Sequence, residues 1–139
     1  VSADAAYNVF GRCFTITSEG VAEAGSGGAF GFAGFLVDPK NQALNGTFAG
    51  GSLAPTLTLP NNSQAACLTM GTIIVTLPAA ANIGDYVVYD NTTGALSTIA
   101  PGDPLPVGTT FANAIVDYYT VTAAGLAVIT VSPALVIPT

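Results

Sequence analysis

Between residues 85 and 96 the sequence runs Asp85-Tyr86-Val87-Val88-Tyr89-Asp90-Asn91-Thr92-Thr93-Gly94-Ala95-Leu96. Tyrosine and valine, which favour strands, fill positions 86–89, and residues 91–94 are typical of a tight turn. The stretch therefore predicts a β-hairpin. The same pattern recurs along the chain, as short runs of β-branched and aromatic residues bounded by Gly, Pro, Asn or Asp, and no window is typical of a helix.

The remaining strands are predicted on either side of this hairpin. In the second half of the chain the predicted strands, which include the two of this hairpin, are Met70–Pro78, Asp85–Asp90, Ala95–Ile99, Phe111–Thr122 and Leu126–Ser132, with a second hairpin turn at Ala123-Ala124-Gly125. Toward the N-terminus, Tyr7–Thr17 predicts a strand broken near Gly11, and an apolar run over Ala29–Val37 ends at Asp38-Pro39. This spacing predicts one all-β domain over residues 1–139, an antiparallel barrel or sandwich of jelly-roll-like type with long Gly/Pro-rich loops.

The last seven residues, 133–139, predict an extended apolar tail. Leu135, Val136 and Ile137 lie between Pro133 and Pro138, with no obvious partner in the chain's own pattern. Such a tail can either reach a neighbouring molecule or pack over its own domain.

Charge is scarce in this sequence. Half of the residues are apolar and only 7% are charged, so the chain has enough apolar content to fold rather than stay disordered. Eight acids against Arg12 and Lys40 give a net charge of −6, which excludes nucleic-acid binding because that binding depends on clustered Lys and Arg. No apolar stretch approaches the roughly 20 residues of a membrane-spanning helix, so no membrane association is predicted.

The side chains for most enzyme chemistry are missing. The chain has no histidine, which removes the Ser-His and Cys-His dyads of nucleophilic catalysis. Asp85 and Asp90 flank one predicted strand, but acids at strand ends more often hold turns than act as a catalytic pair. No calcium-loop spacing of acids occurs. The sequence therefore predicts no catalytic residue, no metal site and no cofactor.

The two cysteines, Cys13 and Cys67, are far apart in the sequence and belong to no paired motif. With no histidine and no Cys-x-x-Cys spacing, a metal site is disfavoured. We favour two reduced, buried core residues of a protein made in a reducing cytosol, over a disulfide.

Three strings, in this order along the chain, carry a family resemblance: Gly11-Arg12-Cys13-Phe14-Thr15, then Gly31-Phe32-Ala33-Gly34-Phe35-Leu36-Val37-Asp38-Pro39-Lys40, then Ile83-Gly84-Asp85-Tyr86-Val87-Val88-Tyr89. With the Gly94-Ala95-Leu96 hairpin and the strand Leu126–Val131 they resemble the bacteriophage structural cement proteins, also called capsid decoration proteins. The resemblance implies a non-enzymatic virion protein on the outer surface of the mature capsid. Such a protein binds the major capsid (coat) protein at junctions between capsomers, braces the shell against internal DNA pressure, and self-associates as a homotrimer or dimer.

Apolar residues outside regular alternation are the candidate partner contacts. They are Phe30, Phe32 and Phe35, for which core packing is the favoured alternative, then Pro101, Pro104, Leu105, Pro106 and Val107, and finally Leu135, Val136 and Ile137 in the tail. A different class of function stays open, an extracellular bacterial surface or fibre β-sandwich module, which predicts a Cys13–Cys67 bridge or a Lys40 isopeptide cross-link. A carbohydrate-binding domain ranks last because the chain has no tryptophan and its tyrosines fall mostly within predicted strands.

Overall fold

A computed structural model describes residues 7–17, 20–25, 32–37 and 65–132 of the chain. Within these residues it contains strands and turns but no helix that could span a membrane. The strands are β1 (Cys13–Ile16), β2 (Ala22–Ala24), β3 (Phe32–Val37), β4 (Ala66–Leu68), β5 (Gly71–Leu77), β6 (Tyr86–Asp90), β7 (Leu96–Ile99), β8 (Thr109–Asp117) and β9 (Gly125–Val131).

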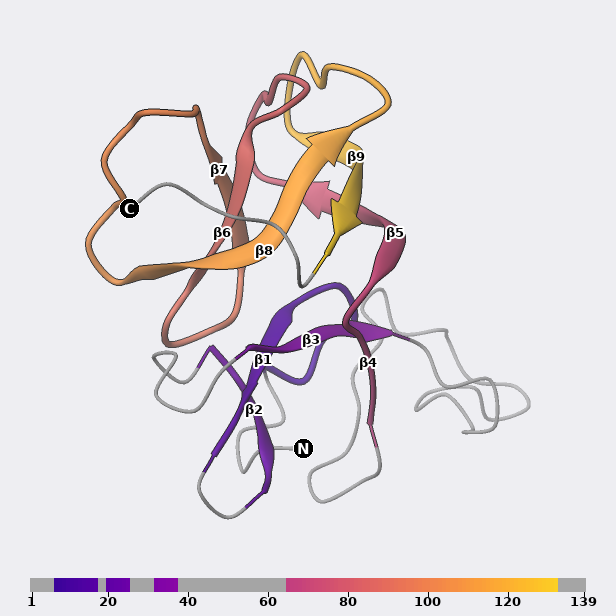
Figure 1. Cartoon of the computed structure of the whole chain (residues 1–139), viewed down its shortest axis with the longest axis vertical. Coiled ribbons are helices and arrows are strands. Elements are labelled where there is room, and N and C mark those ends of the chain that lie inside the picture. The colour runs from indigo at the N-terminus through magenta and orange to yellow at the C-terminus, as the bar shows by residue number, and fades with distance from the viewer. Residues whose placement is uncertain (1–6, 18–19, 26–31, 38–64, 133–139) are drawn as a thin grey trace, which may run out of the picture.

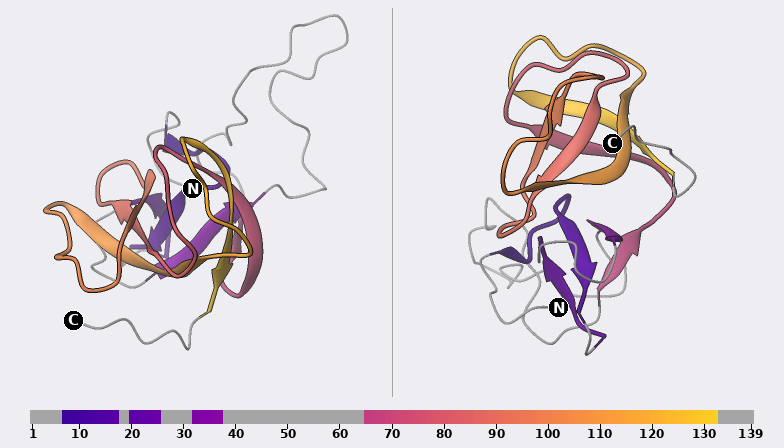
Figure 2. Two further views of the ribbon diagram at one scale, coloured as in Figure 1. Left: turned by 90° about the horizontal axis from the view of Figure 1, so that it is seen from above. Right: turned by 60° about the vertical axis from the view of Figure 1, so that its left-hand side comes forward.

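The strands form two antiparallel sheets, one above the other in Figure 1 and in the right-hand view of Figure 2. The first sheet has the order β2-β1-β3-β4 and the second has the order β5-β9-β8-β6-β7. The prediction of an all-β antiparallel fold is confirmed in its sandwich form, since neither sheet closes into a barrel. Each sheet comes from one continuous half of the chain, so its strands do not pass back and forth between sheets as they do in a jelly roll.

The strands predicted in the second half of the chain are present, with one correction. The hairpin of β6 and β7 has the expected turn at residues 91–94, and β5, β7 and β9 begin and end close to the predicted residues. β8, however, ends at Asp117 instead of continuing to Thr122, and the chain bends at Tyr118, which has a positive φ of 66°. Val121 instead forms an isolated bridge with Ala81, so the β8–β9 connection is longer than the predicted three-residue turn.

One hydrophobic core joins the two sheets. Cys13 and Phe35 of the first sheet pack against side chains of the second sheet, including Val87, Tyr89 and Ile129, all of them almost fully buried. Phe32 packs edge-to-face on Phe35 with ring centroids 5.6 Å apart. A smaller cluster covers the opposite face of the first sheet, where Tyr7 and Phe10 pack on buried Phe14 and Leu36. The first sheet is therefore covered on both faces.

The β6–β7 turn is locked onto the first sheet. The N–H of Cys13 donates to the Gly94 carbonyl at 3.0 Å, and the Arg12 guanidinium donates to the Thr93 carbonyl at 3.1 Å. Gly94 has a φ of +69°, and a Cβ at this position would collide with the Cys13 carbonyl oxygen. Only glycine allows this close approach, which fixes the second sheet relative to the first.

Candidate functional site

The loop between β7 and β8, residues 100–108, presents five of the predicted contact residues to solvent; we call it the proline loop. Pro101, Pro104, Leu105, Pro106 and Val107 are all exposed, and the Val107 side chain is completely so. These residues therefore lie where a partner can reach them.

Hydrogen bonds within the proline loop, and one from the β6–β7 turn, fix the conformation of the loop. The Asp103 N–H donates to the Ala100 carbonyl at 3.1 Å, and both the N–H and the hydroxyl of Thr109 donate to the Pro106 carbonyl. The Asn91 N–H, from the β6–β7 turn, donates to the Gly108 carbonyl at 2.9 Å. A loop fixed in this way loses little conformational freedom when its apolar side chains are covered by a partner.

The phenylalanines predicted as partner contacts lie elsewhere. Phe35 has no exposed surface and belongs to the shared core, so it offers nothing to a partner and packs as the favoured alternative expected. Phe32 is half-buried against the same core, with its ring centroid 6.4 Å from that of Tyr89. Phe30 and the tail residues Leu135, Val136 and Ile137 lie outside the described residues.

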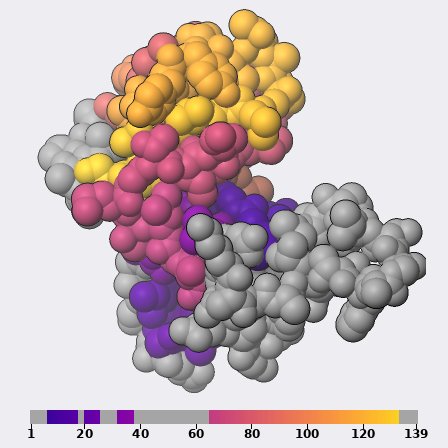
Figure 3. Space-filling model, turned by 90° about the vertical axis from the view of Figure 1, so that its right-hand side faces the viewer, coloured from indigo at the N-terminus to yellow at the C-terminus, as the bar shows by residue number. Residues whose placement is uncertain are grey.

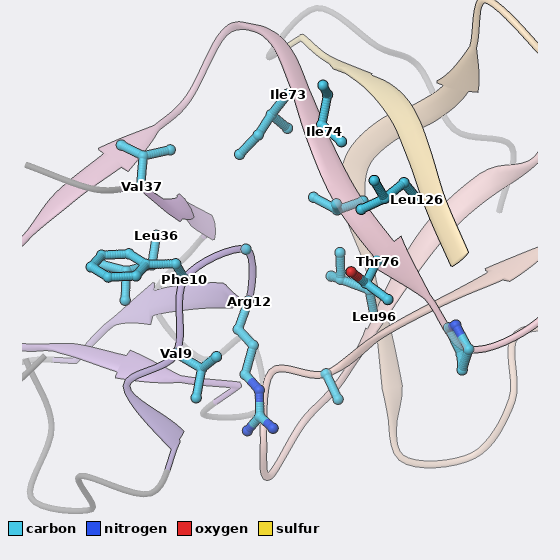
Figure 4. Close-up of a pocket in the computed structure, with 14 residues that line it drawn as sticks. Val9, Phe10, Arg12, Leu36, Val37, Ile73, Ile74, Thr76, Leu96 and Leu126 are labelled. Carbon is cyan, nitrogen blue, oxygen red and sulfur yellow. The ribbon is translucent and has the colours of Figure 1, made fainter. Parts of the chain in front are cut away.

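A second apolar surface is a groove of about 810 Å³ between the two sheets, which the sequence did not indicate. Figure 4 shows the residues that line it on both sides: Val9, Phe10 and Val37 belong to the first sheet and the segment before it, and Ile73, Ile74 and Leu126 belong to the second. Figure 3 shows this side of the molecule, where the segment of β4 and β5 (magenta) lies at the surface between the first sheet (indigo) and β9 (yellow).

The groove runs along the edge of β5. Side chains alternate across a strand, so Ile73 and Val75 point to the core face of the second sheet and Ile74 and Thr76 to its outer face. All four line the groove, and a space that touches both faces of one strand must lie at that strand's edge. β5 is the first strand of its sheet and pairs only with β9 within the described residues.

The outer side of the groove is unusually apolar for a protein surface. Ile74 is 63% exposed, and Leu126 on β9, which lies opposite Thr76, is 62% exposed. The sequence does contain a signal for the exposure of Ile74 and Leu126. Both residues belong to unbroken apolar runs, Ile73-Ile74 and Leu126-Ala127-Val128-Ile129. In any strand, one member of such a run must face away from the core.

Charge around the groove is positive although the chain as a whole is acidic. Arg12, one of only two cations in the sequence, lines the groove, and its guanidinium lies 5.7 Å from the centre of the Tyr7 ring. None of the acidic residues in the described part of the chain lines it.

The carboxylates of Asp85 and Asp90 hold turns, as their positions predict. Asp85 accepts a hydrogen bond from the Asn82 N–H at 2.8 Å. One oxygen of Asp90 accepts from the N–H groups of Thr93 and Thr92, both at 2.8 Å, and these bonds lower the pKa of Asp90. Both acids are engaged in their own turns, and the described residues contain no group of acids and cysteines that could hold a metal ion.

Cys13 and Cys67 are free thiols, and the sheet geometry keeps them apart. Cys13 faces the shared core from β1, whereas Cys67 on β4 packs with Leu36 on the opposite face, and β3 lies between the two strands. Strands two places apart are separated by about 10 Å, beyond the roughly 4.4–6.8 Å between Cα atoms that a disulfide requires. Burial, and to a smaller extent the charge of the Cys67 thiolate, raises the pKa of the Cys13 thiol well above its usual value. The bridge expected of an extracellular module is therefore not formed. Lys40 lies outside the described residues.

Comparison with known families gives a match over nearly the whole chain. The family model described as "Structural cement protein (E217 gp24/Pam3 gp6)" matches residues 1–132. The chain belongs to the phage structural cement protein family. A search of curated proteins finds no relative that matches it.

Membership assigns this cement protein a structural role as a component of the virion capsid, and the resemblance found in the sequence is confirmed. The proline loop and the β5 groove both present apolar side chains at the surface of the described residues. Each is a candidate for contact with another protein.

Proposed function

We propose that this cement protein binds the outer surface of the mature capsid at junctions between coat-protein capsomers, stabilises the shell against internal DNA pressure, and has no enzymatic activity. The observation that carries the proposal is the proline loop, a fixed and exposed apolar loop on a protein of a capsid cement family. A standard specific interface buries about 1,600 Å² in total, which two or three loops of a domain this size can supply.

Stabilisation follows from selective binding. A protein that binds the mature shell better than its immature form shifts the equilibrium toward the mature state by mass action. Many copies act on one closed lattice, and self-association as a homotrimer would let each assembly bind through several contacts at once. Each individual contact with the shell can then be weak and the shell is still stabilised. An acidic chain is also not drawn to the packaged DNA.

Binding to shells tests the proposal. Purified protein is mixed with empty coat-protein shells, expanded or unexpanded, and the amount that sediments with them is measured. We expect saturable binding to expanded shells in the micromolar range or below, and much weaker binding to unexpanded ones. Absence of co-sedimentation by folded protein at micromolar concentration would overturn the proposal.

Matched variants test the proline loop itself. The double variant Leu105→Asp/Val107→Asp should bind expanded shells at least about tenfold more weakly, because burying one exposed aliphatic side chain contributes about 1.5 kcal/mol or more. Ile83→Asp is the control, because Ile83 is also a large exposed aliphatic residue but lies in the β5–β6 connection. Equal binding by both variants would remove the proline loop from the interface.

A further inference from the structure

We propose that the groove along the edge of β5, which pairs with no strand among the described residues other than β9, receives residues 133–139 of a second copy of the chain, which adds a strand to the second sheet. This inference rests on the self-association included in the proposed function and identifies the surface that would carry it. The receptor is built from described residues, and the ligand is the segment that directly follows β9.

The edge of β5 has the backbone groups that an added strand requires. Alternate residues of an edge strand direct their N–H and C=O groups outward. β5 pairs residue by residue with β9, from Gly71 opposite Val131 to Leu77 opposite Gly125. Within the described part of the chain no strand pairs with its other edge. β7 approaches β5 on this side and Ala95 and Leu96 line the groove there, so an extended peptide can bind by main-chain hydrogen bonds along the part of the edge that β7 leaves open.

The walls of the groove match an uncharged, apolar peptide. Side chains of an added strand alternate, so one row would contact Ile73, Val37 and Phe10 and the other row would contact Ile74 and Leu126. Burial of these partly exposed residues would remove apolar surface from water on both molecules.

Residues 133–139 have the composition that fits. The segment Pro133-Ala134-Leu135-Val136-Ile137-Pro138-Thr139 carries no charge, which matters because two copies of net charge −6 repel each other. Its prolines cannot donate to a ladder, so pairing would be limited to Ala134–Ile137 and the residues beside it.

The geometry favours a second copy over the same chain. β9 leaves the sheet at Val131, opposite the first residue of β5, and the Ser132 N–H donates to the Asn113 carbonyl of β8 at 3.0 Å. The free edge of β5 lies on the other side, about 10 Å from β9. To reach that edge in its own molecule the segment would have to cross β5 and reverse direction. A neighbour's segment has no such restriction, and repeated head-to-tail exchange can close a ring such as a trimer.

Sedimentation of the free protein tests the exchange. We expect the full chain to be oligomeric at micromolar concentration, and a chain ending at Ser132 to be monomeric with an unchanged circular dichroism spectrum. Ile74→Asp in the full chain should also give monomers, because it places a charge in the groove. Val107→Asp, which lies in the proline loop, should leave the oligomer intact.

Mixing the two defective chains identifies donor and acceptor. The Ile74→Asp full chain keeps its segment, and the chain ending at Ser132 keeps its groove, so the mixture should form complexes that neither chain forms alone. A synthetic peptide of residues 133–139 should bind the shortened chain at least tenfold more tightly than the shortened chain that carries Ile74→Asp.

Three results would overturn the inference: a monomeric full chain, a shortened chain that retains the full chain's oligomeric state, or a peptide that binds equally well with and without Ile74→Asp. Binding of the peptide to the shortened chain, combined with a monomeric full chain, would mean that the segment occupies the groove of its own molecule. None of these measurements involves shells, so failure here and failure of shell binding are distinguishable.

Discussion

At the residue scale, Gly94 is a position where the fold leaves no room for a side chain. A Cβ there would collide with the Cys13 carbonyl oxygen, at the contact that fixes the second sheet relative to the first. We expect Gly94→Ala to lower the free energy of unfolding by about 3 kcal/mol or more, since both a positive φ and a backbone collision must be relieved.

Gly102→Ala is the matched control for this measurement. Gly102 also has a positive φ, +95°, but nothing lies within 4 Å of the place where its Cβ would be. It should cost only the left-handed strain of about 1–2 kcal/mol. Urea unfolding followed by circular dichroism measures both variants, and equal losses would show that the contact between Gly94 and Cys13 is not a structural constraint.

Asp90 makes a small pH-dependent contribution at the same turn. Hydrogen bonds from the Thr93 and Thr92 N–H groups favour its carboxylate and lower its pKa below the ordinary 3.8. The stabilisation is therefore complete above pH 3.8, where the unfolded carboxyl is also ionised, and is lost as pH falls through the lowered pKa of the folded state.

Asp90→Asn removes the charge and keeps an acceptor. The variant should be less stable than the natural chain at pH 7, by under about 1 kcal/mol because the carboxylate is partly exposed, and the difference should disappear near pH 2. Thermal unfolding across that pH range measures it. A difference that grows toward low pH would contradict the assignment.

At the scale of elements, β5 shows which features could be predicted from the sequence and which could not. Its bounds follow from a β-branched run between Met70 and Pro78, and the hairpin of β6 and β7 follows from its turn residues. The groove could not be predicted, because it depends on which edge of which sheet β5 occupies, and pairing order is decided by contacts between distant segments.

β2 and β4 were missed for a related reason. Each has only three residues and is defined by its partners rather than by its own pattern.

The proline loop and the phenylalanines also differ in how well their exposure could be predicted from the sequence. Both were chosen as apolar residues outside regular alternation, yet Val107 is exposed and Phe35 is buried. Proline and glycine at 101–108 prevent strand formation locally, so that surface loop could be predicted from the sequence alone. Phe35 is placed by its pairing opposite Cys13 on β1, which the sequence does not specify.

Two neighbouring isoleucines on β5 provide a test of this element. Ile73 packs against the shared core, whereas Ile74 faces outward. Ile73→Asp should reduce stability by about 3 kcal/mol or more, because it places a charge against apolar side chains, while Ile74→Asp should change it by about 0.5 kcal/mol or less. Urea unfolding of a monomeric background, the chain ending at Ser132, compares them without interference from association. If Ile74→Asp were instead the more destabilising variant, Ile74 rather than Ile73 would have to face the core.

At the scale of the whole molecule, the structure describes a small, acidic sandwich whose prominent surface features are apolar. The shared core and the locked β6–β7 turn give it a fixed shape, and the proline loop and the β5 groove lie on that rigid body. We propose that the loop contacts the coat protein and, separately, that the groove joins copies to one another. The two surfaces can be altered separately.

We expect that binding of this protein strengthens a capsid under pressure. The most direct measurement is the temperature at which DNA-filled capsids release their DNA, determined by fluorescence of a DNA-binding dye, for capsids without the protein and after adding it back to saturation. We predict that release moves to higher temperature with added protein, and that the Leu105→Asp/Val107→Asp variant at the same concentration fails to move it. An unchanged release temperature on capsids shown to be fully occupied would contradict the account.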